Sequence, residues 1–492
     1  MAHHLSTELF FWTIVSLGIL GLYANMLNPF AHINRVKRPY YTLVRDGAIV
    51  LERRGRPTVV RTSLVWMLFA YYKCGWHIVS NVRAGAKAKS KTFDAVIADI
   101  HRLRFDPRKP YLISGDHFNV LYPRNLGVFY HATLDPRAVL GEVDWQNRQR
   151  VYLQTVAFAL EVFAAHGDCT TTIVPVGARA VCCINIYRYP SDALYGILYA
   201  LSALRGTPGP YETYFSPPAP TYTIQTTRAA EQLLEQYRAT LALLLGKYVT
   251  RVYDEKSGFV RTDVALSSAK DAVLRESSFY DNVIFWKTCL LAQELGVLLP
   301  IDIDFAALKK RILDTFWLED AGHFLDDLSA AAKTDQHYSA DWLAVLFTGF
   351  LDARDPAERH YLRRAADYTI AMQLDMPLPL RYQESNRAGR EVLFVRCVVP
   401  SYGGSAIWSF WGAEFIKLLT ILAQQGEGAA YADRARQHIA TYEQMIAKYK
   451  GYPEVYTTGG AMLRSPLYQS VRQTGWVVGF EQARELLRQA GR

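Results

Sequence analysis

The feature of this sequence that most constrains its fold is a helical pattern that runs from about residue 93 to the C-terminus. Apolar residues recur there at spacings of three and four, as in AEQLLEQYRATLALLLGKYV (230–249) and SADWLAVLFTGFLDA (339–353). This is the pattern of helices that pack on one side. We expect helices near residues 93–104, 145–165, 191–205, 228–249, 263–274, 279–296, 304–315, 339–353, 358–374, 405–425, 430–449 and 468–489.

No stretch rich in Pro, Gly or Ser divides these segments, so the helices should share one core in a large all-α domain. An α/α toroid, with an inner and an outer ring of helices, is one such architecture, and a superhelical array is another. Periodicity alone does not separate the two. Short strand-like segments lie between the helices at residues 170–177, 250–263 and 391–401.

The positive charge of the chain is concentrated in one short region. The formal net charge is +9, but residues 35–110 alone carry 17 Lys and Arg against 5 Asp and Glu. Since Glu8 is the single charged residue of positions 1–34, residues 111–492 sum to a net charge of −2. A near-neutral main domain argues against nucleic-acid binding, which depends on a basic surface.

An uncharged apolar segment, LFFWTIVSLGILGLYANML, lies at residues 9–27 and has about the length that spans a bilayer. No Lys or Arg precedes it and no clear small-residue cleavage site follows it, so we expect an uncleaved single-pass anchor rather than a signal peptide. A second apolar segment, at residues 64–80, is interrupted by Lys73 and flanked by basic residues. This favours an interfacial or buried helix.

The chain is therefore expected to have three regions: a membrane anchor at 1–34, a basic membrane-proximal region with an apolar helix at 35–92, and the main domain at 93–492. The cluster of Arg35, Lys37 and Arg38 after the anchor favours a cytoplasmic main domain at the cell membrane. If residues 64–80 span the bilayer instead, the main domain lies outside.

The cysteines and histidines show no metal-site spacing. The six cysteines are scattered, without CxxC pairs, and the histidines form no HExxH pattern. We expect buried free thiols, no transition-metal site and no organic cofactor.

Two acids lie in segments that mix carboxylates, aromatic residues and small residues. In LRESSFYDNVIFW (274–286), Asp281 and Asn282 stand where a loop enters an apolar helix, a position that also suits a helix-capping acid. In GYPEVYTTGG (451–460), Glu454 lies between Tyr452 and Tyr456, which are expected to orient it. A solvated loop acid is the alternative there.

Two further segments have the same character. In SGDHFNVLYPRNLGVFY (114–130), Asp116 and Arg124 flank an aromatic loop and form either a structural ion pair or contacts to sugar hydroxyls. In SYGGSAIWSFWGAEF (401–415), Trp408 and Trp411 follow two glycines at a spacing of three. Such a pair is either core packing or a ligand platform.

Taken together and in this order, the segments resemble the inverting (α/α)6-barrel glycoside hydrolases, in particular glycoside hydrolase family 63 and its trehalase-like relatives. RESSFYDNVIFW is similar to the family's acid segment, ES-x-x-DN-x-x-x-W/Y, and SYGGSAIWSFW to its Gly-rich segment. PEVYTTGG is similar to the segment of the base, and LYPRN to a W-x-R-D sugar-binding loop.

The resemblance implies an (α/α)6 barrel that cleaves an α-linked glucoside or mannoside. Asp281 would be the general acid and Glu454 the general base, on opposite sides of the scissile bond. The implied substrate contacts are Asp116, Tyr122, Arg124, Asn282, Trp408, Trp411, Tyr452 and Tyr456.

The chain departs from the family pattern at two positions. Asn125 stands where the family often has an acid, and Tyr122 where it often has Trp. These changes keep open a second hypothesis, a non-catalytic glycan-binding or scaffold protein with the same fold. A third, an α/α-barrel sugar epimerase, depends on paired histidines, for which the sequence shows no convincing candidate.

Overall fold

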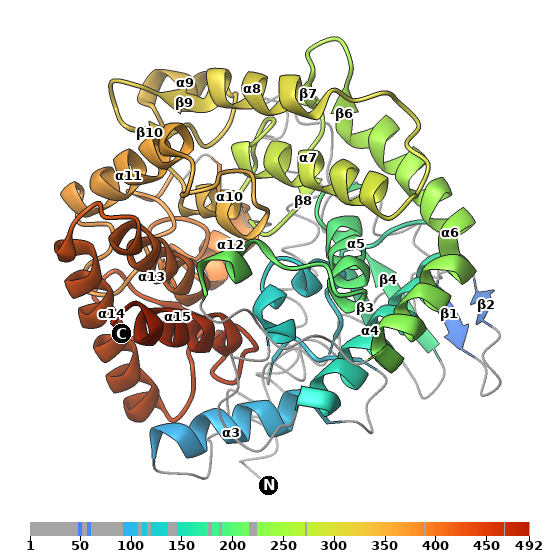
Figure 1. The fold of residues 1–492 in the computed structure, drawn as a ribbon, viewed down its shortest axis with the longest axis horizontal. Helices are drawn as coiled ribbons and strands as arrows, with labels where there is room; N and C mark the ends of the chain where they lie inside the picture. The colour runs from blue at the N-terminus through green and yellow to red at the C-terminus, as the bar shows by residue number, and fades with distance from the viewer. Residues whose placement is uncertain are drawn as a thin grey trace, which may run out of the picture.

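Helices dominate the fold, and they form two layers around a common centre (Figure 1). The structure is a computed structural model. It describes residues 48–51, 57–60, 92–106, 111–115, 120–135, 145–175, 180–185, 189–215, 224–270, 273–387, 390–466 and 468–491.

The outer layer consists of long helices that bury one face. In α6, for example, the buried positions Leu234, Leu241, Leu245 and Tyr248 follow a helical stripe. The bounds of the outer helices are α3 (Phe93–Arg104), α4 (Trp145–His166), α6 (Ile224–Val252), α8 (Phe305–Phe316), α11 (Pro356–Ala371) and α14 (Ala429–Tyr449).

The inner layer consists of helices that are buried nearly all round. Every residue of α5 is buried, as are residues 409–422 of α13, and a helix without a polar face requires such an interior place. The bounds of the inner elements are η2 (Pro123–Leu126), η3 (His131–Leu134), α5 (Ala193–Leu204), α7 (Phe279–Glu294), η5 (Ala340–Leu343), α10 (Ala344–Phe347), α13 (Ser409–Gln424) and α15 (Val477–Ala490).

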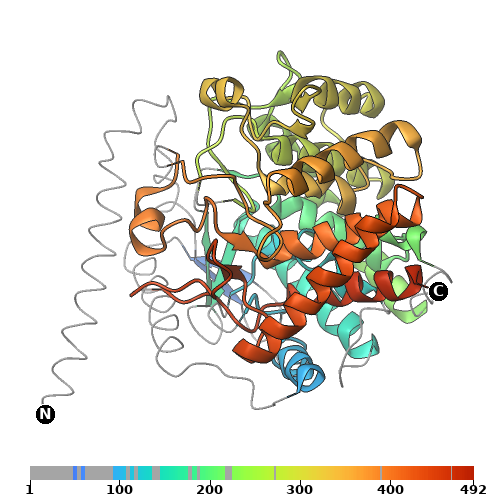
Figure 2. The same ribbon diagram turned by 90° about the vertical axis from the view of Figure 1, so that its left-hand side faces the viewer.

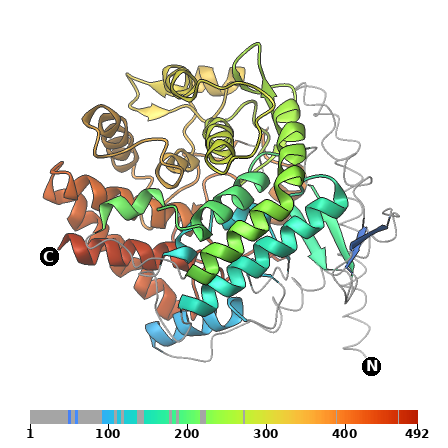
Figure 3. The same cartoon turned by 45° about the vertical axis from the view of Figure 1, so that its right-hand side comes forward.

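The inner elements close into a ring. Starting from η3, each packs against the next in the order α5, α7, η5 with α10, α13 and α15, and α15 returns to η3. The outer helices pack on this ring from outside: α4 and α6 on α5, α8 on α7, α11 on α13, and α14 on both α13 and α15. Figure 3 shows α4 and α6 beside each other, and Figure 2 shows α13, α14 and α15 packed together. Contacts among the described residues therefore favour a toroid over an open superhelical array.

The strands are short and lie at the edges of this helical body. A four-stranded antiparallel sheet has the order β2–β1–β4–β3, and α4 packs against β1 and β2. Its strands are β1 (Ala48–Leu51), β2 (Pro57–Val60), β3 (Thr172–Pro175) and β4 (Ala180–Ile184). The two-stranded pairs are β5 (Tyr189–Pro190) with β8 (Leu266–Ser267), β6 (Tyr253–Asp254) with β7 (Phe259–Val260), β9 (Trp317–Leu318) with β10 (His323–Phe324), and β11 (Ile407–Trp408) with β12 (Val455–Tyr456).

Most expected helices are present, but three expectations were wrong. Residues 263–274 contain no helix in their described part, because β8 pairs there with β5. Residues 391–401, expected to be strand-like, contain the helix α12 (Leu393–Val398). The last helix begins at Val477 rather than near residue 468, since residues 469 and 473 form β-bridges to other segments. Short helices without an expected counterpart include η2, η3, η4 (Pro210–Tyr214) and α9 (Ala330–Asp335).

The expected membrane segments at residues 9–27 and 64–80 lie outside the described residues. Of the helices that the structure describes, none combines the length and the apolar character needed to cross a bilayer.

Candidate functional site

The N-terminal ends of the inner elements meet at one end of the ring. Asp281, in the first turn of α7, contacts the segment that leads into α5. Arg275, just before α7, donates to Asp341 of η5 at 2.6 Å. Trp408 and Trp476 precede α13 and α15 directly, and their rings stack with centroids 5.5 Å apart. This end of the ring therefore brings together side chains from segments that are far apart in the sequence.

Asp281 is buried, with 4% of its surface exposed. Its two carboxyl oxygens accept hydrogen bonds from Ser191 Oγ at 2.6 Å and from Ser278 Oγ at 2.5 Å. Its backbone N–H in turn donates to Ser278 Oγ, so Ser278 is the N-cap of α7. Burial raises the pKa of Asp281, while the Arg275 guanidinium and the two hydroxyls act in the opposite direction.

Asn282, expected to contact substrate, instead holds two parts of the chain together. Its Nδ2 donates to Ser277 Oγ and to Ser278 O, and its Oδ1 accepts from the N–H of Val260 in β7. Asn282 is 2% exposed, so its amide is buried in these bonds and the expectation was wrong.

Glu454 lies on the partly exposed side of the segment that leads into β12. The hydroxyls of Tyr402 and Tyr468 donate to its two carboxylate oxygens, each at 3.4 Å. The half-buried side chain of Glu454 is therefore held between two phenol groups.

Tyr452 and Tyr456, which were expected to orient Glu454, point into the core. Tyr452 donates to Ser409 O at 2.9 Å, and both rings pack against Tyr442. Both tyrosines are fully buried. The orienting role belongs by geometry to Tyr402 and Tyr468, whose hydroxyls donate to the two carboxylate oxygens of Glu454.

Trp408 is part of an aromatic wall beside Glu454. Its Nε1 donates to Tyr402 O at 2.8 Å, and its ring packs against Tyr402 and Tyr382 with centroids 4.9 Å away in each case. Trp411 is fully buried and packs between Tyr382 and Phe347, so it is core rather than a ligand platform.

Arg124 links the surroundings of the two expected catalytic carboxyls. Its Nη1 donates to Ser268 O at 2.5 Å, and its Cζ lies 5.3 Å from the ring centre of Tyr122, which is partly exposed. It interacts electrostatically with Tyr280, next to Asp281, and with Tyr402, next to Glu454. Asp116, its expected neighbour, lies outside the described residues.

Asn125, where the family often has an acid, is also buried in internal hydrogen bonds. Its Nδ2 donates to Ser114 Oγ and Tyr130 Oη at 3.2 Å each. Asn125 is 5% exposed, and these hydrogen bonds hold the segment that contains Arg124 in place.

A buried ion cluster on the same end of the ring had no counterpart in the sequence analysis. Its centre is Asp326, whose carboxylate has nitrogens of Lys270, Arg275, Arg387 and Arg390 within 4.0 Å. Burial alone would raise the pKa of Asp326, but these cations hold it well below its usual range. Nothing in the local pattern identifies the cluster, because Asp326 is more than 50 positions from Lys270 and Arg275 along the chain.

Lys270 connects this cluster to the aromatic wall. Its Nζ donates to Ser339 Oγ at 2.8 Å and lies 4.6 Å from the ring centre of Tyr382. Burial lowers the pKa of Lys270 to about 8. Tyr382 also donates to Asp341, at 3.4 Å, so the wall and the cluster form one connected network.

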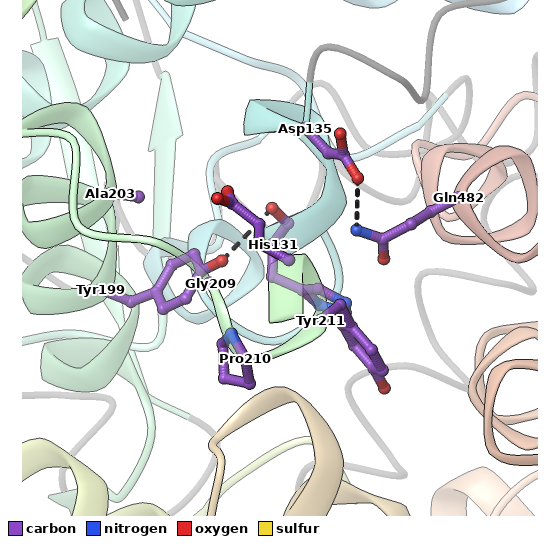
Figure 4. A pocket seen from close by; sticks show the side chains of 9 residues that line it. His131, Asp135, Tyr199, Ala203, Gly209, Pro210, Tyr211 and Gln482 are labelled. Carbon is purple, nitrogen blue, oxygen red and sulfur yellow. Dashed lines mark hydrogen bonds between the residues drawn. The ribbon is translucent and has the colours of Figure 1, made fainter. Parts of the chain in front are cut away.

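A small cavity lies away from this end, toward the C-terminal half of α5 (Figure 4). Its lining residues are His131, Asp135, Tyr199, Ala203, Gly209, Pro210, Tyr211, Glu212 and Gln482. Neither Asp281 nor Glu454 borders it, so it is separate from the candidate site.

In the part of the chain that the structure describes, no group of three His, Cys, Asp or Glu side chains is arranged to hold a metal ion. Cys169 and Cys289 are buried free thiols, Cys183 is buried, and Cys397 is an exposed free thiol.

Comparison with known proteins gives similar structures but no similar sequences. No protein-family model and no curated protein matches the chain. One similar solved structure is a GH63 mannosylglycerate hydrolase from Thermus thermophilus in complex with glucose, with 12% identity, a TM-score of 0.48, and 80% of this chain and 99% of that chain covered. Another is a D-mannose isomerase, with 10% identity, a TM-score of 0.45, and 81% of this chain and 99% of that chain covered. A glycoside hydrolase family 15 glucoamylase from Hypocrea jecorina is also similar, with 10% identity, a TM-score of 0.41, and 78% of this chain and 67% of that chain covered.

Proposed function

We propose that this protein is a carbohydrate-active enzyme, an inverting glycoside hydrolase in which Asp281 is the general acid and Glu454 the general base. The observation that carries the proposal is the contrast between two carboxyl groups at one end of the ring. Asp281 is buried, which raises the pKa of its carboxyl group, whereas Glu454 is half-buried and its two carboxylate oxygens accept hydrogen bonds from tyrosine hydroxyls. Acid and base assignments follow from environments that separate two carboxyl groups in this way.

The proposed reaction divides the proton transfers between these residues. Asp281 donates its proton to the glycosidic oxygen as the bond from that oxygen to the anomeric carbon breaks. Glu454 accepts a proton from a water molecule whose oxygen attacks the anomeric carbon from the opposite face. This geometry requires a carboxyl separation of about 6.5–9.5 Å, which leaves room for the water.

The surrounding residues supply substrate contacts in this proposal. Trp408 and Tyr402 offer aromatic surface beside Glu454, and Arg124, which contacts Tyr122, interacts electrostatically with the neighbours of both carboxyl groups. The substrate class, an α-linked glucoside or mannoside cleaved from its end, rests on the sequence motifs. The bilayer anchor at residues 9–27, and with it a location at the cell membrane, is likewise proposed from the sequence.

One observation favours the second candidate, a glycan-binding protein without turnover. Both carboxyl oxygens of Asp281 are taken by serine hydroxyls, and little of its surface is exposed. Asp281 must give up its hydrogen bond to Ser191 or to Ser278 and contact the substrate oxygen before it donates a proton. The non-catalytic candidate requires no such exchange.

The test is hydrolysis of a panel of α-glucosides, α-mannosides and trehalose, with the anomer of the product followed by NMR. Wild type, Asp281→Asn and Glu454→Gln are compared with the control variant Glu443→Gln. Glu443 lies on the outer helix α14, where its carboxylate pairs with Arg484 of α15. We expect inverted product from wild type and the control, with a loss of at least a thousandfold in both site variants. Binding of these sugars without turnover in wild type would instead support the second candidate.

A further inference from the structure

Arg104, the last residue of α3, has a buried guanidinium that is only partly bonded. The residue is 1% exposed, and its Nη1 donates to Ser114 O at 2.7 Å. Its Nε and Nη2 have no hydrogen-bond partner among the residues that the structure describes. These two nitrogens form the edge with which arginine binds anions in a forked arrangement. Buried donors without a partner are costly, so this edge calls for a ligand.

The guanidinium is held by close packing. Its Cζ lies 4.4 Å from the ring centre of Tyr130, whose hydroxyl donates to the same Ser114 carbonyl. It also lies directly against Gly475, where an added Cβ would be 2.3 Å from Cζ and 2.4 Å from Nε and Nη2. Gly475 is two residues before α15, so the unpaired edge lies beside the N-terminus of that helix.

The positive charge of Arg104 is not paired with any carboxylate among the described residues. No described carboxylate forms an ion pair with it, and Glu481 of α15 is bonded to His101 at 2.8 Å. Burial lowers the pKa of Arg104, and only Tyr130 opposes this effect. An unpaired buried charge costs several kcal/mol, so binding of a counter-ion beside Arg104 would stabilise the fold.

We propose that the free edge of Arg104, beside the N-terminus of α15, is a binding site for a small monovalent anion, a halide such as chloride. The Nε and Nη2 of Arg104 are two donors without a partner among the described residues, which suits an ion that only accepts hydrogen bonds. Arg104 carries one positive charge that no described carboxylate pairs with, and a single monovalent ion neutralises it. The dipole of the 14-residue helix α15 adds favourable potential.

This inference is independent of the proposed hydrolase activity. Tyr130 interacts electrostatically with both Arg104 and Glu454, so the anion would lie behind the candidate site rather than in it. A bound water is the neutral alternative, and it would leave the charge of Arg104 unbalanced.

The test measures the thermal unfolding midpoint of the full chain as sodium gluconate is replaced by sodium chloride at constant ionic strength. We expect the midpoint of wild type to rise by about 1–3 °C on going to 0.2 M chloride, since a ligand that binds the folded state stabilises it. Arg104→Met should remove this rise. Arg434→Met, which breaks the Arg434–Asp375 ion pair elsewhere, should keep it although it lowers the midpoint itself.

Bromide-soaked crystals of wild type provide the second measurement and do not depend on any variant folding. Anomalous density within about 3.5 Å of Nε and Nη2 is the expected result. Equal midpoints in chloride and gluconate would overturn the proposal. A bromide peak without chloride dependence in solution would overturn it as well, since it would show binding at crystal concentration only.

Discussion

The strongest stability prediction concerns a buried ion pair within α13. The side chains of Lys417 and Glu414, one turn apart, are 0% exposed, and Nζ lies 2.5 Å from Glu414 Oε1. Nζ also donates to Gln482 Oε1 at 2.9 Å and lies 3.2 Å from His131 Nε2. Lys417→Met removes one partner of this pair and leaves the other buried.

The expected cost is large because an unpaired buried charge is left behind. At pH 8 we expect Lys417→Met to destabilise the fold by about 3–5 kcal/mol. Adding Glu414→Gln removes the uncompensated charge and keeps an acceptor for the Tyr211 hydroxyl. The double variant should therefore regain at least about 2 kcal/mol of this loss, because replacing both members of a buried pair is often nearly neutral.

The pH dependence follows from His131, which lies 3.4 Å from Glu414 Oε1. Burial, together with the charge of Lys417, lowers the pKa of His131 to about 4. In the unfolded chain the pKa is about 6.5, so the unfolded state binds more protons between these values. Wild type therefore loses roughly 3 kcal/mol as the pH falls from 6.5 to 4. Without Lys417, the nearby Glu414 carboxylate makes protonation of His131 easier. The loss of stability of Lys417→Met relative to wild type should therefore be smaller at pH 5 than at pH 8.

Urea unfolding followed by circular dichroism at pH 8 and pH 5 measures these differences. Lys310→Met is the matched control, because Lys310 forms an equally short pair with Asp314, but at the surface. We expect no measurable change for that control. A cost below about 1 kcal/mol for Lys417→Met at pH 8, or a deficit independent of pH, would refute the reasoning.

Three further predictions concern other parts of the chain. Tyr402→Phe removes one of the two hydroxyls that donate to Glu454, so kcat/KM should fall by about tenfold, and an unchanged kcat/KM would argue against Glu454 as base. Gly196→Ala should cost about 1–3 kcal/mol in thermal unfolding, because its Cβ would lie 2.1 Å from a carbonyl oxygen of η2, whereas Gly246→Ala, with open space around it, should stabilise by about 0.5–1 kcal/mol. Asp304→Ala should cost about 1 kcal/mol, since Asp304 accepts from two N–H groups at the start of α8, and an unchanged midpoint would contradict this capping role.

The fold followed from the sequence wherever a segment was long and its period clear. The stripes of α6 and the all-apolar character of α5 identify an outer and an inner helix before any contact is known. Short apolar segments did not have this property. Residues 391–401 form α12 although their composition suits a strand, and residues 266–267 form β8 because β5 lies beside them. Periodicity does not distinguish helix from strand over so few residues.

The sequence by itself determined which carboxyl groups stand at helix starts and in aromatic loops, because capping and turn chemistry act over three or four residues. Asp281 and its cap Ser278 are such a case. Only the tertiary structure decided what surrounds them. Glu454 is held by Tyr402 and Tyr468, which lie 52 and 14 positions away, rather than by its neighbours in the strand. The closed ring of helices brings together segments that are far apart in the sequence, and a local sequence pattern does not show which of these segments will meet.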